Sequence, residues 1–472
     1  MFGLSTEMSL ILLLCLLAAA AFEFINGFHD TANAVATVIY TKSLKPTVAV
    51  VWSGIWNALG VFIGGVGVAM GILNLLPPTA LTDQNIYHAL ALVLALVVTA
   101  ILWNLGTWYL GLPCSSSHTL IGSIFGVGLA YILLPGNSAA ALNWTKVQEA
   151  GLSLLISPVV GFSLALLLMV VLKKLLKKRN ELFEHQHHRK SPPWGIRAVL
   201  IFTCTSVSFS HGSNDGQKGV GLVMIVLIAL LPTRFALDTS KNPQDLLTHL
   251  YRTEVILKTI DTNKLSDEDE TTRAIMLKKI QNIKPQLLQA HHFESMSQEE
   301  IVNIRKSILS LNKEFKKLTT ATIEHPVPLS GTQLTMLRHE INTLKSYAEY
   351  APYWVIMMIA LSLGIGTMIG WKRIVVTVGE KIGKTPLTYA QGASAELVAA
   401  STILFSSHLG LPVSTTHVLS SGVAGTMVAK EGFKNLRKKT VRSILIAWVL
   451  TLPVTIVMAG GLFLLFRWIL GN

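Results

Sequence analysis

The chain has 472 residues, of which 51% are hydrophobic and only 14% are charged. So much apolar surface needs lipid as its solvent, so the composition excludes an ordinary soluble protein and indicates a polytopic membrane protein. The net charge of +13 does not indicate a nucleic-acid partner, because residues 233–350 hold 16 basic and 15 acidic side chains and much of the excess lies in short loops between apolar runs.

Ten apolar segments of about membrane-spanning length follow one another along the sequence. They cover residues 8–41, 48–76, 87–110, 115–134, 149–172, 196–231, 353–371, 387–408, 414–428 and 441–469. One pass requires about 20 residues, whereas the first and sixth segments are much longer and contain polar motifs, so we expect both to be interrupted helices. The predicted fold class is an all-α polytopic membrane protein with about ten transmembrane segments.

Basic residues cluster in four loops that fall on one side of a ten-pass topology: Lys42 with Lys45, then 173–197, 372–384 and 430–442. The positive-inside rule makes that side the cytoplasm. We therefore expect a multi-pass protein of a bacterial inner membrane, with both termini and the long polar segment in the periplasm. Counting the sixth segment as two passes would move the polar segment to the cytoplasm.

Two polar motifs occur twice each. GLPCSSSHTLIG at 111–122 recurs as GLPVSTTHVLSS at 410–421, and FINGFHDTANAVATVI at 24–39 has a fainter copy, FSHGSNDGQKGVGLVM, at 209–224. The two offsets, 299 and 185 residues, differ by 114, which matches a 118-residue insertion at 233–350 in place of a connector of about five residues in the first half. An odd number of passes per half predicts two repeats of inverted topology.

This organisation predicts five regions along the chain. They are transmembrane repeat 1 at 1–172, a basic cytoplasmic linker at 173–195, the start of transmembrane repeat 2 at 196–231, a soluble, mainly helical insertion at 232–351, and the remainder of repeat 2 at 352–472.

The GLP motifs place hydroxyl residues just after a proline, a pattern that favours a helix start. Helix N-termini attract anions, so two of them meeting at the membrane midplane would form a cradle for a tetrahedral oxyanion. The hydroxyl residues are Ser115, Ser116 and Ser117 in the first copy and Ser414, Thr415 and Thr416 in the second. His118 and His417 can orient a hydroxyl or carry a proton. The alternative is that these hydroxyls only join helices by hydrogen bonds.

The Asp motifs place carboxyl groups inside apolar runs, where charge is costly and usually marks an ion or proton pathway. Candidate coupling residues are Asp30, Asn33 and His29 in the first copy, Asp215, Asn214 and Gln217 in the second, and Glu396 further along. Lys218 follows Asp215 by three residues, so it can pair with that carboxylate, contact the anion, or both. The alternative is a polar network that only holds helices together.

At these residues the chain resembles the inorganic phosphate transporter (PiT) family, which carries a GANDVANA-like sequence in each half. The copies here read GFHDTANA at 27–34 and GSNDGQKG at 212–219, and the GLPxSxxH pair is also a family feature. The resemblance covers almost the whole chain outside the insertion and is strongest to the bacterial low-affinity, proton-coupled members. It implies secondary active transport by alternating access, with phosphate held by the GLP hydroxyls and Lys218, and with no catalytic residue or cofactor.

Two departures from the family pattern concern the coupling ion. Where sodium-coupled members have asparagine, this chain has His29 in the first copy and Lys218 in the second. An ammonium in place of a cation ligand favours protons over sodium as the coupling ion. The resemblance also implies phosphate carried with a divalent metal such as Mg²⁺, and a homodimer is compatible with it. The competing readings are a sodium-coupled phosphate symporter, a transporter of another oxyanion such as sulfate, a passive channel, and a membrane-embedded hydrolase that uses Ser117 and His118.

Overall fold

The computed structural model describes residues 4–81, 83, 85–137, 142–184, 191–261, 265–319 and 329–471. Every regular element in these ranges is a helix, and a single β-bridge joins Gly383 to Leu436. The predicted all-helical class is therefore confirmed. The chain divides into two compact units, the first made of Met1–Val226 and Ala351–Asn472 and the second of Leu227–Tyr350.

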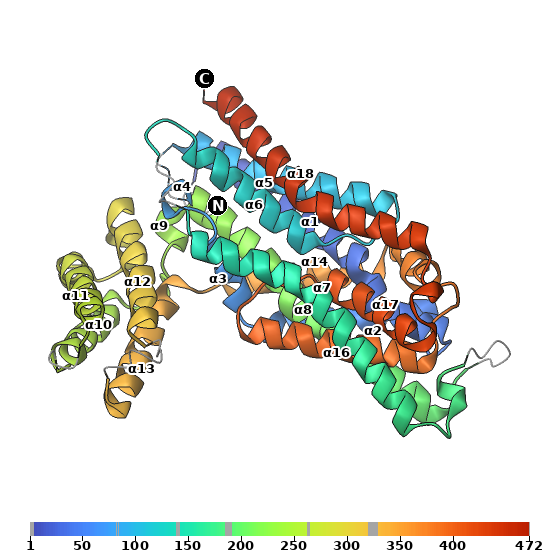
Figure 1. The fold of residues 1–472 in the computed structure, drawn as a ribbon. Helices are drawn as coiled ribbons and strands as arrows, with labels where there is room; N and C mark the ends of the chain where they lie inside the picture. Colours follow the sequence, from blue (N-terminus) through green and yellow to red (C-terminus); the bar gives the residue numbers. More distant parts are fainter. Residues whose placement is uncertain are drawn as a thin grey trace. The chain divides into compact units, whose positions relative to one another are not determined.

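The first unit holds helices from both ends of the chain (Figure 1). They are α1 (Thr6–Tyr40), α2 (Pro46–Ile63), α3 (Gly67–Leu73), α4 (Pro78–Leu81), α5 (Ile86–Tyr109), α6 (Ser116–Ile132), α7 (Trp144–Leu175), most of α8 (Trp194–Leu230), α14 (Tyr353–Met368), α15 (Lys372–Val376), α16 (Tyr389–His408), α17 (Thr415–Glu431) and α18 (Lys438–Leu470).

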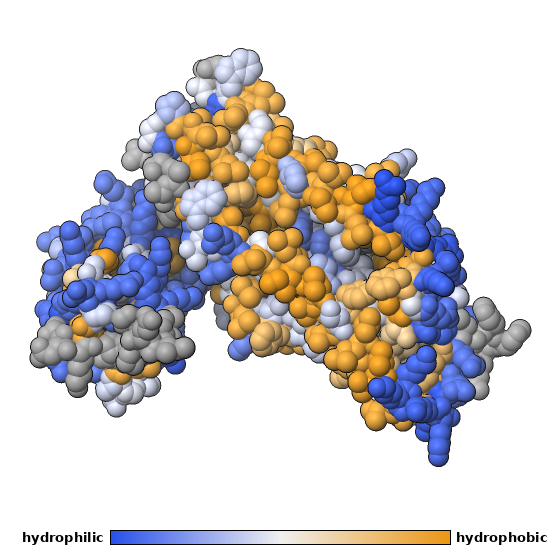
Figure 2. Space-filling view, viewed as in Figure 1, coloured by the Kyte–Doolittle hydropathy of each residue, from blue (hydrophilic) through white to orange (hydrophobic). Residues whose placement is uncertain are grey.

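Five of these helices, α1, α2, α5, α7 and α18, are long and apolar enough to cross a membrane. Large apolar side chains on their outer faces, such as Leu155, Val449 and Val457, are 67–75% exposed. Figure 2 shows this apolar surface, with hydrophilic residues gathered at the end of the unit where α7 stops and α18 starts. Exposed apolar helices of this length need lipid around them, so the chain is a multi-pass membrane protein. The count of ten passes stays a prediction.

The expected interruptions of the first and sixth segments are wrong, because α1 and α8 run without a break through their polar motifs. Their glycines serve helix packing instead. A Cβ at Gly27 would lie 2.5 Å from the carbonyl oxygen of Leu363, and one at Gly212 would overlap the carbonyl oxygen of Asn57. Small residues that allow backbones to approach closely are the usual contact of membrane helices. The break falls elsewhere, between α2 and α3, at Gly64–Val66.

Helices from the two ends of the chain pack in exchanged pairs. The helix α6 lies along α18, and α7 lies along α17. Glycines again mediate both contacts: Gly126 of α6 meets Ile456 of α18, and Gly425 of α17 meets Phe162 of α7. The last helices of the two predicted repeats, α7 and α18, are thus each packed against a helix of the other predicted repeat.

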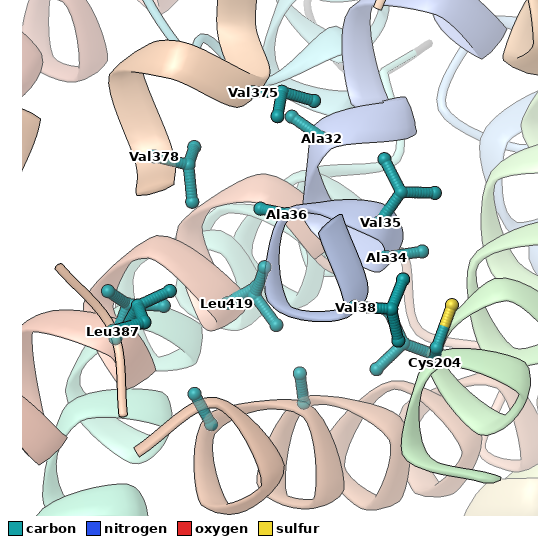
Figure 3. Packing of buried hydrophobic residues seen from close by; sticks show 14 of the residues in the cluster. Ala32, Ala34, Val35, Ala36, Val38, Cys204, Val375, Val378, Leu387 and Leu419 are labelled. Carbon is teal, nitrogen blue, oxygen red and sulfur yellow. The ribbon is translucent and has the colours of Figure 1, made fainter. Parts of the chain in front are cut away.

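The part of α1 that follows Asp30 is locked into an apolar core (Figure 3). Its alanine and valine side chains, among them Val35 and Val38, pack against Cys204 of α8, Val375 of α15 and Leu419 of α17. These side chains are almost completely buried. Close packing of this kind leaves little room for movement, so it fixes the position of the Asp30 carboxylate at the start of the segment.

The second unit is a set of helices with hydrophilic outer faces: α9 (Pro232–Phe235), α10 (Pro243–Lys258), α11 (Asp267–Leu288), α12 (Gln298–Thr319) and α13 (Gly331–Ala348). The helical character expected of this segment is confirmed by these five helices. Inside the unit, the buried guanidinium of Arg305 donates hydrogen bonds to the carbonyl oxygens of Ala236 (2.7 Å) and Ala348 (2.5 Å). Burial lowers the pKa of Arg305 to about 10.

Candidate functional site

The two GLP motifs form the same local structure. In each, a glycine with positive φ, Gly111 at +67° and Gly410 at +68°, turns the chain after the preceding helix. Ser115 then caps α6 by accepting a hydrogen bond from the amide of His118 (3.2 Å), and Ser414 caps α17 by accepting one from the amide of His417 (3.1 Å). The predicted helix starts are confirmed, and each presents buried hydroxyls in its first turn.

These two helix starts meet inside the first unit. Ser117 Oγ, on α6, donates a hydrogen bond of 2.9 Å to the carbonyl oxygen of Val413, which lies just before α17. The imidazole rings of His118 and His417 lie with their centroids 4.3 Å apart, and His417 also stacks on Trp448. Two N-termini with their partial positive charges therefore share one buried region.

The two aspartates join this region through matching hydrogen bonds. Ser116 Oγ donates to Asp30 Oδ2 (3.3 Å), and its counterpart in the second motif, Thr415, donates to Asp215 Oδ2 (3.1 Å). Thr416 in addition donates from the second half to Asp30 Oδ1 in the first. Both carboxylates are fully buried, and each is tied to the first turn of a GLP helix.

The side chain of Lys218 lies between Ser117 of the first GLP motif and Asp215. Its ammonium donates hydrogen bonds to the hydroxyl of Ser117, to Asp215 Oδ1 and to the carbonyl oxygen of Val413 (2.8 Å). The side chain is about 2% exposed, so its charge is compensated by these three oxygens and not by water. The pairing with Asp215, one of the alternatives that the sequence left open for Lys218, is found.

His211 lies between the two carboxylates. Its Nε2 is 3.5 Å from Asp30 Oδ2 and 3.2 Å from Asp215 Oδ2, while its Nδ1 is 3.1 Å from Asn57 Oδ1. Two carboxylates and one ammonium leave the cluster with one excess negative charge when His211 is neutral. A proton on His211 or a bound cation removes that excess, which matters because an uncompensated charge is costly in this buried place.

The same three side chains form a candidate cation site. Ligand atoms of Asp30, His211 and Asp215 all lie within 4.8 Å of one another. Carboxylate oxygens suit hard cations, and imidazole suits transition metals, so the set can accept a cation of either kind.

His211 and Asn57 were not predicted from the sequence. The residue that matches His211 in the first copy of the motif is Asn26, so the duplication gave no signal for a histidine. The spacing did carry one, because residues four apart lie on the same helix face and His211 precedes Asp215 by four. Asn57 lies on another helix, and nothing in its neighbourhood in the sequence marks it.

Several predicted residues lie outside this cluster. His29 contacts Thr107 (3.3 Å between Nε2 and Oγ1), and Asn214 donates to Ser407 Oγ (2.9 Å). Gln217 accepts a hydrogen bond from the amide of Val68 (2.8 Å) at the start of α3. These three side chains hold neighbouring elements to α1 and α8, although His29 Nδ1 also lies 3.7 Å from Asp30 Oδ1.

Glu396 and Asn33 are the two remaining residues predicted for coupling. Glu396 on α16 is buried and accepts a hydrogen bond from Thr203 Oγ1 (2.6 Å), away from the paired aspartates. The side chain of Asn33 lies outside the described part of the structure.

The geometry gives no support to a hydrolase. The hydroxyl of Ser117 donates to a backbone carbonyl, and the described contacts of His118 include no hydrogen bond from its Nδ1 to an orienting acid. A nucleophile needs a base that is itself oriented by a third group. What the cluster offers is a set of hydroxyls, an ammonium and helix N-termini for an anion, beside two carboxylates for a cation or proton.

Comparison with known proteins places this geometry in context. Residues 26–459 match the phosphate transporter family. The chain is 41% identical over 98% of its length to the low-affinity inorganic phosphate transporter PitA of Escherichia coli, covering 97% of that protein. It is 28% identical to the probable low-affinity inorganic phosphate transporter of Bacillus subtilis, covering 94% of this chain and 93% of that protein. A solved structure titled "The sodium-dependent phosphate transporter" has the same fold, with a TM-score of 0.52, 19% identity and coverage of 97% and 99% of the two chains.

Proposed function

The chain belongs to the phosphate transporter family, and we propose that it carries inorganic phosphate across the membrane as a secondary active transporter. Its relatives are named as transporters, so the chain is a transporter and not an enzyme. The observation that carries the proposal is the meeting of the α6 and α17 N-termini at Asp30, Asp215 and Lys218.

Phosphate suits this site for electrostatic reasons. Two helix N-termini and the Lys218 ammonium provide positive potential, and hydroxyls of Ser116, Ser117, Thr415 and Thr416 provide donors. These hydroxyls now donate to Asp30, Asp215 and Val413, so a bound phosphate would take over some of those hydrogen bonds. The nearby carboxylates would repel a bare dianion, which is why the anion has to arrive with protons or with a metal.

We propose protons, with phosphate carried in part as its complex with a divalent metal such as Mg²⁺, as the coupled species. Lys218 supplies a fixed positive charge in contact with Asp215, and His211 can hold a proton between the two carboxylates. With His211 protonated, the site is electrically balanced before the anion enters. The charge of the bound anion is then balanced by the protons or the divalent metal that arrive with it, so the loaded site can change sides without an unpaired buried charge.

Sodium coupling is the second candidate, and a specific observation favours it. The ligand atoms of Asp30, His211 and Asp215 are close enough to hold one cation. The protein of the solved structure with the same fold is described in its title as sodium-dependent.

For the transport cycle we propose two inverted repeats that rock around the shared site. The support is the exchanged packing of α6 with α18 and of α7 with α17, together with the matched bonds from Ser116 to Asp30 and from Thr415 to Asp215. We place the protein in the bacterial inner membrane with the basic end of its first unit toward the cytoplasm, on the positive-inside rule.

Uptake of labelled phosphate into proteoliposomes tests the proposal. We expect uphill accumulation driven by an inwardly directed proton gradient, stimulated by Mg²⁺ and unaffected when sodium is replaced by choline. Loss of uptake in choline at fixed pH would select sodium as the coupling ion. If sulfate inhibited the uptake of labelled phosphate as strongly as unlabelled phosphate does, phosphate selectivity would be contradicted. The absence of any uptake would contradict the proposal as a whole.

A further inference from the structure

A cavity of about 650 Å³ lies at the C-terminal end of α5, and its lining includes Gly111, the first residue of the first GLP motif, but none of the motif hydroxyls or aspartates. Its lining joins aromatic and basic side chains from two parts of the chain: Trp108, Tyr109, Trp371, Lys372, Arg373 and Lys381. All of them belong to the first unit. The function proposed above uses none of these residues.

The walls of the cavity are held together by specific contacts. Trp108 Nε1 donates to the carbonyl oxygen of Gly370 (3.0 Å), and Arg373 donates from an Nη to the carbonyl oxygen of Tyr109 (2.8 Å). The Arg373 guanidinium also lies 5.1 Å from the ring centre of Trp108 and 5.0 Å from that of Tyr109. Cation–π contacts at both rings fix the guanidinium plane and leave most of its N–H donors for a ligand.

The basic side chains of the cavity have no counter-ion in the part of the chain that the structure describes. Among the described residues, neither Lys372, Arg373 nor Lys381 forms an ion pair, and the neighbouring Glu380 accepts a hydrogen bond from Tyr40 (2.8 Å) instead. Three uncompensated cations around one hollow attract an anion with several acceptor oxygens, and a guanidinium held by aromatic rings suits a phosphate group in particular.

The surroundings favour a lipid as the source of that phosphate. Leu110 and Tyr109, at the rim, are 69% and 66% exposed on a unit whose outer surface is apolar. Tyrosine and tryptophan with basic residues at the end of membrane helices are typical of the headgroup region of a bilayer. We propose that this cavity binds the phosphate headgroup of an anionic phospholipid, with its acyl chains along the apolar rim.

Trp108, which lines the cavity, packs against α1, the helix that carries Asp30. The ring of Phe28, two residues before Asp30 on α1, lies 5.0 Å from that of Trp108, and a Cβ at Gly370 would lie 3.0 Å from Phe28. A bound lipid and Asp30 would therefore be connected through the packed contact between Trp108 and Phe28.

Native mass spectrometry of the purified full-length chain with added phosphatidylglycerol tests the proposal. The variant K372Q/R373Q/K381Q should bind the tightest phosphatidylglycerol at least about tenfold more weakly than the unchanged protein. The matched control K174Q/K177Q/K178Q removes the same charge from three exposed lysines outside the cavity and should change binding less than about twofold. Arg373→Lys, which keeps the charge and loses the planar stacking, should give an intermediate loss.

A second arm separates the two sources of phosphate. Inorganic phosphate is added to the Asp30→Asn protein, in which the transport site is disabled, with and without the triple substitution. If inorganic phosphate displaced phosphatidylglycerol from this cavity, and the triple variant lost that displacement, the cavity would be an anion site for free phosphate and the lipid proposal would be overturned. Equal phosphatidylglycerol binding by the unchanged protein, the triple variant and Arg373→Gln, all eluting as folded protein, would overturn the proposal.

Discussion

The imidazole rings of His118 and His417 lie with centroids 4.3 Å apart, although 299 residues separate them in the sequence. They occupy the same position in the two GLP motifs, so their contact brings the two copies face to face. The hydroxyls that precede each histidine are then directed to the same pair of aspartates. The proposed alternating access depends on one site built from both motif copies.

Removing either aspartate charge should abolish transport. Asp30→Asn and Asp215→Asn each leave the hydroxyl contacts in place but take away the negative charge that pairs with the coupled proton or cation. We expect phosphate uptake by proteoliposomes to fall at least about 100-fold, with normal protein in the membrane fraction. Asp83→Asn, a matched change at a partly buried aspartate paired with His88, should leave uptake unchanged. Near-normal uptake by Asp30→Asn would remove that residue from the mechanism.

Lys218→Met should damage both stability and transport. It leaves the Asp215 carboxylate buried without its ammonium, and breaking a buried pair of this kind costs about 3–5 kcal/mol. The double variant D215N/K218M removes both charges, so its thermal unfolding temperature should recover most of the loss while uptake stays absent. Recovery of uptake in the double variant would show that the pair only supports the fold.

His211→Gln should flatten the pH dependence of uptake. Glutamine can still contact Asn57 but cannot carry the proton that balances Asp30 and Asp215. We expect uptake by the unchanged protein to rise as the external pH falls, and uptake by the variant to be weak and nearly independent of pH. If the variant kept the full pH dependence, the coupled proton would have to be carried by a group other than His211.

Gly212→Ala tests the role of this glycine in packing α8 against α2. The added Cβ would overlap the carbonyl oxygen of Asn57 on α2, so the helices must separate, at a cost of about 1–3 kcal/mol. Gly106→Ala on α5 adds the same methyl group where no atom lies within 4 Å and should be neutral or stabilising by about 0.4–1 kcal/mol. Thermal unfolding of the two variants in one detergent compares them, and equal unfolding temperatures would contradict the packing role.

Acid should loosen the second unit at Glu254. Hydrogen bonds from Lys258 and then Lys284 lower the pKa of this carboxyl below its ordinary value. Its contribution to stability is therefore complete above the ordinary pKa and is lost as the pH falls through the lower, folded-state pKa. Hydrogen exchange of α10 and α11 in the full chain, corrected for intrinsic rates, should show this loss. Glu254→Gln should remove that pH dependence, whereas the exposed Glu299→Gln should leave it in place.

Local chemistry made part of this structure predictable. Proline and serine in each GLP motif fixed where α6 and α17 begin, and the three-residue spacing of Asp215 and Lys218 predicted their pairing. The compact unit Leu227–Tyr350 overlaps the segment expected as an insertion. These features depend on neighbours in the sequence, which a reader of the sequence can see.

The features that were missed depend on partners distant in the sequence. A glycine in a polar motif is compatible with a break or with a close helix contact, and only the Asn57 carbonyl beside Gly212 decides between them. Gln217 and Asn214 carry ion-ligand chemistry, yet they bind backbone and hydroxyl groups of neighbouring segments. Side-chain type alone does not distinguish a ligand from a structural contact.

Equilibrium binding of labelled phosphate to the purified protein tests the central claim, one site shared by both motif copies, most directly. S116A/S117A changes only the first copy, and T415A/T416A changes only the second. We predict about one phosphate per chain in the unchanged protein and loss of that whole site in either variant. Binding that falls by half in each variant, and to zero only when both are combined, would mean two separate sites and would contradict the account.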